Sequence, residues 1–224
     1  MYTELVFILH IVLSAGFLLF SARLGKECLI AFLSLSAVLA NLFVTKEMTL
    51  CSLTVTCSDV YAVQAILALN YLQEYYGKKA AEKASVIGFI CLVFFAVMAK
   101  MHLAYPPSIY DSASDAFARI LVSTPRIVLA SITTFFLVQR LDIVFFRLLQ
   151  NWLKGKYFPI RAGLSMMVSQ TLDTTLFAFL GLYGIVHHIG HVIMVSLFVK
   201  ILVIWLSAPF TTLSGRFLGE KSHV

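Results

Sequence analysis

Long uninterrupted runs of apolar residues alternate with short polar segments along the whole chain. Seven runs approach the roughly 20 residues that a helix needs to cross a bilayer: residues 4–22, 27–44, 54–73, 84–104, 118–149, 162–184 and 190–213. The runs are continuous, whereas strands of membrane barrels alternate apolar and polar residues over about 10 positions. The pattern therefore predicts an all-α bundle of about seven transmembrane helices, forming one domain over residues 1–224.

The fifth run is too long for a single crossing. As one helix, residues 118–149 would extend about 48 Å, against about 30 Å of hydrocarbon. Pro125 is expected to kink this helix near its outer end, because proline interrupts helical hydrogen bonding. Its inner end is expected to project into the cytoplasm.

Basic residues indicate the orientation of the bundle. The links after the first, third and fifth runs and the tail carry Arg23, Lys26, Lys78, Lys79, Lys83, Arg147, Lys154, Lys156, Arg161, Arg216 and Lys221. The alternate links contain Lys46 as their one basic residue. Because Lys and Arg concentrate on the cytoplasmic side of a membrane, the N-terminus is predicted outside and the C-terminus in the cytoplasm.

The composition favours a membrane protein and argues against other classes. Hydrophobic residues make up 60% of the 224 positions and charged residues 12%, against about 25% charged in soluble domains. The net charge of +6 does not indicate nucleic acid, because the basic residues do not form one patch. The chain has no phosphate-binding loop motif, no paired-cysteine spacing, no HExxH and no GxSxG. We therefore expect no cofactor, no metal and no enzymatic activity.

Ionisable side chains within the sixth run mark a candidate site. A charge at the centre of a bilayer costs at least about 2.5 kcal/mol, so it usually faces a cavity or a partner. One stripe of this run repeats every fourth residue: Arg161, Ser165, Ser169 and Asp173. Gln170 lies one turn from Asp173. The alternative is that these polar groups only bond a neighbouring helix.

The third run ends with Asn70 and Glu74, which are one turn apart on the same face as Asp59. A second interpretation of Glu74 is an interfacial bond with nearby lysines.

The fifth and seventh runs add further candidates. Ser131, Gln139 and Asp142 fall on one side of the fifth run, and Arg126 lies near its outer end. Arg126 could pair with an acid or bind a carbonyl or anionic group of a ligand. Lys200 lies near the middle of the seventh run, where pairing with Asp173 or Asp142 would neutralise both charges.

The stretch HHIGH, residues 187–191, raises a metal or haem interpretation that would also involve His102. No acid or cysteine stands near it in the sequence, and it lies in an expected outer loop. The simpler interpretation is that His187, His188 and His191 are ordinary loop residues.

Three stretches taken together resemble the queuosine precursor transporter family, which is grouped with the vitamin uptake transporters. They are EYYGKKAAEKA from residue 74, PRIVLASITTFFLVQRLDIVFFRLL from residue 125, and LSMMVSQTLDTTLFAFLGLYG from residue 164. The stretch LGKECLIAFLSLSAVLANLFVTKEMTL resembles the branch that adds one N-terminal span to a six-helix core. The resemblance covers about residues 15–210. It departs from the family at Asn70, where the family has an aspartate.

The resemblance implies a small-molecule cargo, namely queuine or its cyano and aminomethyl precursors, which are 7-deazaguanine bases used in tRNA modification. Such a flat, polar-edged base needs hydrogen-bonding groups and aromatic faces. The candidate binding residues are Asn70, Glu74, Arg126, Ser131, Gln139, Asp142, Ser169, Gln170, Asp173 and Lys200. Phe135, Phe136 and Phe177 are candidates for stacking.

The leading hypothesis is therefore a multi-pass inner-membrane importer of these bases, surrounded by lipid and driven by a proton or ion gradient or by intracellular trapping. An alternative is a substrate-binding subunit that docks onto an ATPase module. Two further classes are a membrane enzyme or cofactor protein built on the histidines, and an assembly protein whose polar stripes only hold helices together.

Overall fold

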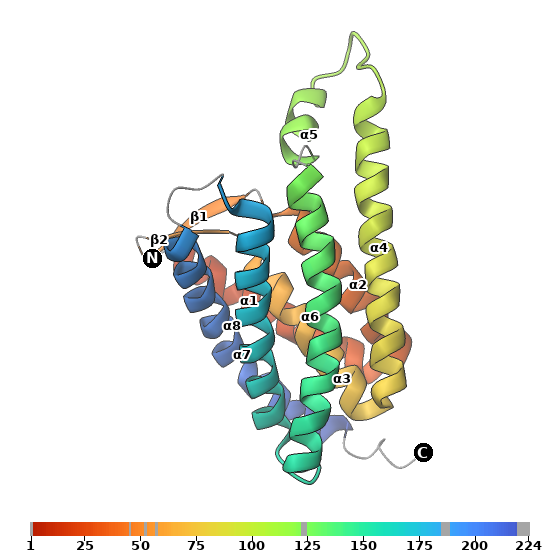
Figure 1. The fold of residues 1–224 in the computed structure, drawn as a ribbon, viewed down its shortest axis with the longest axis vertical. Coiled ribbons are helices and arrows are strands. Elements are labelled where there is room, and N and C mark those ends of the chain that lie inside the picture. Colours follow the sequence, from red (N-terminus) through yellow and green to blue (C-terminus); the bar gives the residue numbers. More distant parts are fainter. Residues whose placement is uncertain are drawn as a thin grey trace.

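The computed structural model describes residues 2–44, 46–51, 53–56, 58–121, 125–184 and 189–218. These form the helices α1 (Tyr2–Leu24), α2 (Lys26–Leu42), α3 (Asp59–Tyr76), α4 (Lys78–Ala104), α5 (Ser114–Leu121), α6 (Pro125–Trp152), α7 (Phe158–Phe177) and α8 (Ile189–Leu218), the π-helical turn η1 (Ala178–Leu182), and the strands β1 (Glu47–Leu50) and β2 (Leu53–Thr56). The helices pack into a bundle, with the hairpin beside one end (Figure 1). The predicted helical bundle is confirmed, but the prediction of a purely α-helical fold is wrong at the hairpin.

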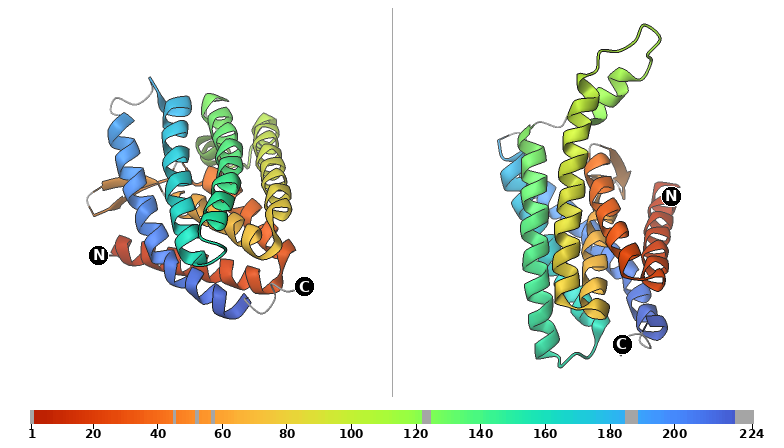
Figure 2. Two further views of the ribbon diagram at one scale, coloured as in Figure 1. Left: turned by 60° about the horizontal axis from the view of Figure 1, so that its bottom comes forward. Right: turned by 90° about the vertical axis from the view of Figure 1, so that its right-hand side faces the viewer.

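Helix α3 forms the centre of the bundle. It contacts α1, α2, α4, α6, α7 and α8, and most of its residues are buried. Burial on every side is typical of a helix in such a central position. Helices α1 and α8 pack against each other on one side of the bundle (Figure 2).

The hairpin changes the expected start of the third helix. Thr54, Val55 and Thr56 belong to β2, in which Val55 lies opposite Met48 and Thr56 opposite Glu47. β-Branched side chains fit the pleated backbone of a strand better than a helix, which explains why the apolar run begins with β structure. Helix α3 therefore begins at Asp59 rather than near residue 54.

The expected single helix over residues 118–149 is also wrong. Its first residues belong to the short helix α5, and α6 begins at Pro125. Proline suits the first helical position because its missing N–H would have no intrahelical partner there. Helix α5 and the loop before it project beyond the rest of the bundle (Figure 1).

The loop before α5 is held by Asp111. Its carboxylate accepts hydrogen bonds from the Ser114 hydroxyl and from the backbone N–H groups of Ala113 and Ser114. The hydrogen bond from Ser114, followed by that from Ala113, holds the pKa of Asp111 below its ordinary value.

The other expected runs match helices whose ends differ by a few residues. Helix α4 begins at Lys78, directly after Gly77, instead of at residue 84, and α7 ends at Phe177 instead of at residue 184, where η1 continues the turn to Leu182. Gly77 has φ 81°, a left-handed conformation that ends α3 and starts α4 without a steric penalty.

Among the residues that the structure describes, four helices are long and apolar enough to cross a membrane: Tyr2–Leu24, Lys78–Ala104, Arg126–Trp152 and Ile189–Ser214. On α4 the exposed face carries large apolar residues, among them Ile90, Phe94 and Met101. Apolar surface of this extent is unusual where a protein faces water. The arrangement fits a helical membrane bundle.

Gly88 allows α4 to pack closely against α2 and α6. An added Cβ at this position would lie 2.7 Å from Cδ2 of Leu33 and 3.4 Å from Cζ of Phe135. Leu33 is fully buried, so it has little room to move. We expect Gly88→Ala to lower the thermal unfolding temperature in detergent, since overpacking costs about 1–3 kcal/mol.

Gly163 on α7 provides the matched control, because an added Cβ there meets nothing within 4 Å. Gly163→Ala is expected to be neutral or slightly stabilising, since it restricts the unfolded chain. Equal unfolding temperatures for the two variants would contradict close packing at Gly88.

Candidate functional site

A cavity of about 610 Å³ lies beneath the hairpin, between α2, α3, α6, α7 and α8. Its walls come from the C-terminal ends of α2 and α7 and from the N-terminal ends of α3, α6 and α8. It therefore occupies the half of the bundle next to the hairpin. Its volume falls within the roughly 300–1,000 Å³ of small-molecule sites.

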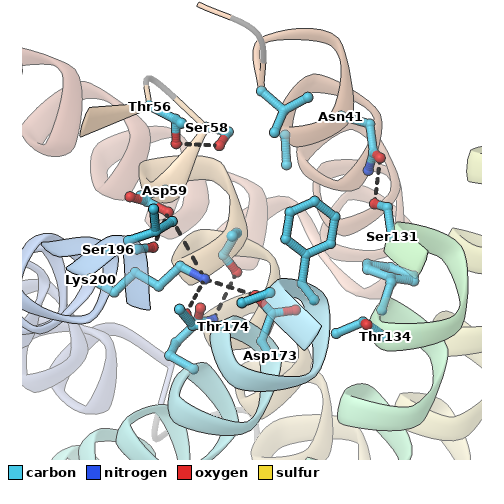
Figure 3. Close-up of a pocket in the computed structure, with 18 of the residues that line it drawn as sticks. Asn41, Thr56, Ser58, Asp59, Ser131, Thr134, Asp173, Thr174, Ser196 and Lys200 are labelled. Atoms are coloured by element: carbon cyan, nitrogen blue, oxygen red, sulfur yellow. Dashed lines mark hydrogen bonds and ion pairs between the residues drawn. The ribbon is translucent and has the colours of Figure 1, made fainter. Parts of the chain in front are cut away.

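Lys200 extends from α8 into the wall of this cavity (Figure 3). Its Nζ donates to Oδ2 of Asp173 at 2.8 Å and to Oγ1 of Thr174 at 2.9 Å, and lies 3.9 Å from Oδ1 of Asp59. The Asp173 side chain is 27% exposed, whereas those of Lys200 and Asp59 are almost fully buried. Of the two partners considered for Lys200, the structure selects Asp173, which faces the cavity.

The cluster contains two acids and one cation. Asp59 also accepts a hydrogen bond from Ser196 at 3.2 Å, while its Oδ2 is buried without a partner in the described part of the chain. With Asp59 and Asp173 ionised, the group has one excess negative charge. Such a wall favours ligands that present hydrogen-bond donors or a positive charge.

Buried amides and a hydroxyl in the cavity wall have unused hydrogen-bonding capacity. Gln139 is fully buried, and neither of its amide atoms has a partner among the residues that the structure describes. Gln170 donates to the carbonyl of Ala62 at 3.2 Å, but its Oε1 has no such partner, and neither has Oγ1 of Thr134. A buried polar group left unpaired costs about 1–3 kcal/mol, so these groups are suited to meet a ligand.

The remaining wall combines small polar and aromatic side chains. Ser131 of α6 donates to Oδ1 of Asn41 on α2, which connects these two helices at one side of the cavity (Figure 3). Phe135 and Phe177 line the cavity and offer aromatic faces. Phe136 instead packs against Phe89, with ring centroids 5.0 Å apart.

The ten predicted site residues divide into two groups. Five line the cavity: Ser131, Gln139, Gln170, Asp173 and Lys200. The other five do not form its wall: Asn70, Glu74, Arg126, Asp142 and Ser169. Arg126 is exposed, and its Nε donates to the backbone carbonyl of Leu180 at 2.8 Å.

Glu74 forms a bidentate ion pair with Arg161. The two guanidinium nitrogens of Arg161 donate to the two carboxylate oxygens at 2.7 and 2.8 Å. The alternative that Glu74 bonds the nearby lysines is therefore wrong, because its partner comes from α7. Asp142 accepts hydrogen bonds from Ser165 and Ser169, each at 2.6 Å. Both groups lie between the cavity and the end of the bundle opposite the hairpin.

Several wall residues were not among the predicted site residues: Asn41, Thr56, Ser58, Asp59, Thr134, Thr174 and Ser196. Asp59 carried a usable signal, since it lies on the same face of α3 as Asn70. Thr56 and Ser58 carried none, because the sequence assigned this segment to a helix.

The histidines do not form a metal site in the described residues. His191 lines the cavity, and His102 packs edge-on against Phe117 with ring centroids 5.3 Å apart. His187 and His188 lie outside the described residues. Within the described ranges, no three His, Cys, Asp or Glu side chains are grouped so that they could hold a metal ion.

Comparison with known proteins identifies the family of the chain. A family described as "Putative vitamin uptake transporter" matches residues 56–214, which is more than half of the chain. A protein of Bacillus subtilis (strain 168) named "Probable queuosine precursor transporter" is 30% identical over 210 residues, which cover 92% of this chain and 91% of that protein. No solved structure matches the chain. The resemblance found in the sequence is thus confirmed: the chain is a multi-pass membrane protein that belongs to the vitamin uptake transporter family.

Proposed function

We propose that this protein imports 7-deazaguanine precursors of queuosine across the inner membrane of the cell. The observation that carries the proposal is the cavity, which has unpaired buried amides and an acid-rich cluster in its wall. The similarity to the Bacillus subtilis transporter suggests the class of cargo. The cavity suggests where that cargo binds.

The wall chemistry suits a guanine-like base. The base presents ring and amine N–H donors on one edge, for which the Asp173 carboxylate and Oε1 of Gln170 are suitable acceptors. Its carbonyl needs a donor, which the amide of Gln139 or the ammonium of Lys200 can supply. The rings of Phe135 and Phe177 are available for stacking on its flat faces.

Seven long helices, α1, α2, α3, α4, α6, α7 and α8, cross the membrane in this proposal. Even α2, with 17 residues, spans about 26 Å, which is near the thickness of the hydrocarbon core. The turns at the end opposite the hairpin carry Lys78, Lys79, Lys154 and Lys156, so this end faces the cytoplasm. The N-terminus and the cavity then lie on the outer side, as an importer requires.

The cytoplasmic half of the bundle closes the path below the cavity. Asp142 with its two serines and the Glu74–Arg161 pair lie in this half. Release of cargo therefore requires these contacts to rearrange, as in transporters that alternate access around a central site.

An uptake experiment in living cells, with modified tRNA as its readout, tests the proposal. The chain is expressed in bacteria that lack their own transporter and cannot make queuosine precursors. The cells receive queuine, the aminomethyl base or the cyano base at low concentration, together with the matching tRNA-inserting enzyme. Modified tRNA on a boronate gel supports import and identifies the cargo. No modification with any base, despite protein in the membrane, contradicts the proposal.

Uptake that requires an added ATPase module supports the alternative of a substrate-binding subunit.

Gln139→Leu is expected to lower uptake about tenfold at low external base. The substitution removes both unpaired amide atoms from the wall and keeps the size of the side chain. One lost hydrogen bond of about 1.4 kcal/mol corresponds to a tenfold change in affinity. Initial rates of uptake of radiolabelled base measure the effect. The control is Gln150→Leu near the cytoplasmic end of the same helix, and equal rates for the two variants would remove Gln139 from the site.

A further inference from the structure

Asp142 is a fully buried acid on the cytoplasmic side of the cavity. Its Oδ1 accepts hydrogen bonds from the hydroxyls of Ser165 and Ser169 on α7, both at 2.6 Å. Its Oδ2 is buried as well and has no hydrogen-bond partner among the described residues. Asp142 also forms no ion pair in that part of the chain.

The other acids in the interior of the bundle each have a cation nearby. Glu74 is paired with Arg161 at 2.7 Å, and Asp173 with Lys200 at 2.8 Å. Asp59 lies 3.9 Å from Lys200. In the ranges that the structure describes, Asp142 therefore differs from these acids in having no countercharge.

Because Asp142 has no countercharge in the described part of the chain, the fold favours its protonated form over its ionised form. An ionised carboxylate without a cation is costly in a low-dielectric interior, and two serine hydroxyls satisfy only one of its oxygens. A proton on Oδ2 removes the charge while Oδ1 keeps both serines. If this residue only connected α6 to α7, an asparagine could do so without any charge.

Unpaired acceptors lie about one helical turn from Asp142, on the side toward the hairpin. Nε2 of Gln73 donates to the carbonyl of Ile143 at 2.9 Å, which aligns α3 with α6 next to Asp142. One turn toward the hairpin on these helices are Asn70 and Gln139. Both are fully buried, and their amide oxygens have no partner among described residues. Either carbonyl offers an acceptor for a protonated carboxyl group.

The same segments also line the cavity. Gln139 belongs to the wall and lies three residues before Asp142 on α6. Gln170 belongs to the wall and directly follows Ser169, which donates to Asp142. A shift of α6 or α7 on cargo binding would therefore change the surroundings of Asp142.

We propose that Asp142 is the proton-binding site of a proton-coupled importer. The inference rests on the proposed transport function. Asp142 takes up one proton from the outer side while the cavity is open to that side, and it releases that proton to the cytoplasm with the cargo.

The charged groups that face this site from neighbouring helices contact one another or an aromatic ring instead of Asp142. On the cytoplasmic side, Arg161 of α7 and Glu74 of α3 neutralise each other. On the cavity side, Asp173 of α7 and Asp59 of α3 surround Lys200 of α8. On α6 itself, the Arg140 guanidinium lies over the Phe136 ring at 5.0 Å.

A sodium ion is the competing ligand, because carboxylate, hydroxyl and amide oxygens also suit hard cations. The oxygen–oxygen distances of 2.6 Å match serine hydroxyls that donate hydrogen bonds to Asp142, so their hydrogens and not their lone pairs face the carboxyl group. A sodium ion would need the serine oxygens to face it instead.

Purified protein in liposomes allows a direct test with radiolabelled queuine and a pH-sensitive dye inside, with the membrane potential clamped. We expect an inwardly directed proton gradient to drive accumulation at least about tenfold above the external concentration, and queuine entry to acidify the interior. Asp142→Asn is expected to lose both effects but to retain exchange of internal for external queuine. Asp115→Asn, an exposed acid in the first turn of α5, is the control and should behave as the unmodified protein.

The outcomes separate the two proposals. If the unmodified protein fails even to exchange queuine or the other two bases, the transport function itself is wrong. If it exchanges base but accumulates it equally without a proton gradient, or only with sodium, the proton proposal is overturned. Accumulation by Asp142→Asn that equals the unmodified protein overturns it as well. Should Asp142→Asn not fold, the dye signal of the unmodified protein decides, and base entry without acidification overturns the proposal.

Discussion

Asp173→Asn is expected to lower uptake of base by about 10- to 100-fold while the amount of folded protein stays near normal. Asp173 faces the cavity and accepts a hydrogen bond from Lys200. Hydrogen bonds to charged groups contribute about 1.5–3 kcal/mol, and each 1.4 kcal/mol corresponds to a factor of ten. The fold should tolerate the change, since Lys200 keeps Asp59 at 3.9 Å and the hydroxyl of Thr174 at 2.9 Å.

Modified tRNA on a boronate gel, together with the level of the protein in the membrane, measures both effects. Asp115→Asn is again the control, because it removes one carboxylate from an exposed position on α5. If Asp173→Asn instead lost the folded protein and left uptake per molecule unchanged, Asp173 would only hold helices together. That result would favour the assembly protein considered from the sequence.

The sequence predicted which helices exist better than how they face one another. Apolar runs predicted the long helices, because a run of about 20 apolar residues has few other solutions. The pair of Lys200 and Asp173 was among two expected pairings, because a buried cation near mid-span needs an acid. The hairpin was missed, since β2 lies in the apolar run that leads into α3 and β1 lies in the link before that run.

Helical periodicity explains why only half of the predicted site lines the cavity. Spacing along one helix shows which residues share a face, but not which neighbouring helix that face meets. Ser169 and Gln170 are adjacent, yet Ser169 bonds Asp142 and Gln170 lines the cavity. Likewise, nothing in the sequence of α3 indicated that Glu74 would pair with Arg161 rather than with the lysines next to it.

The three groups of buried charge differ in how they are compensated, and this suggests different tasks. The cluster around Lys200 combines two acids with one cation, which leaves one excess negative charge when both acids are ionised, and it faces the cavity. Asp142 has no countercharge among described residues and lies below the cavity. The pair of Arg161 and Glu74 is neutral and lies nearest to the end of the bundle opposite the hairpin. Because its charges cancel, we expect the pair of Arg161 and Glu74 to contribute mainly to the stability of the fold.

Arg161→Met is expected to cause the largest loss of stability in this bundle, about 3–5 kcal/mol, because it leaves Glu74 without its partner. Arg161 is fully buried and donates to four oxygens. Two belong to Glu74, and the others are the carbonyls of Gly155 and Lys156 in the turn before α7. Thermal unfolding in detergent measures the loss as a lower unfolding temperature.

The double variant Arg161→Met with Glu74→Gln separates the two kinds of partner. Removing the charge of Glu74 as well should recover the part of the loss that comes from an unpaired buried acid. It should not recover the part that comes from the turn, because the carbonyls of Gly155 and Lys156 still lack their donor. The unfolding temperature of Arg161→Lys is expected to lie between those of Arg161→Met and the unmodified protein. The lysine ammonium keeps the positive charge but cannot form the bidentate pair with Glu74. If the double variant is as unstable as Arg161→Met, the turn contacts rather than the ion pair hold α7 in place.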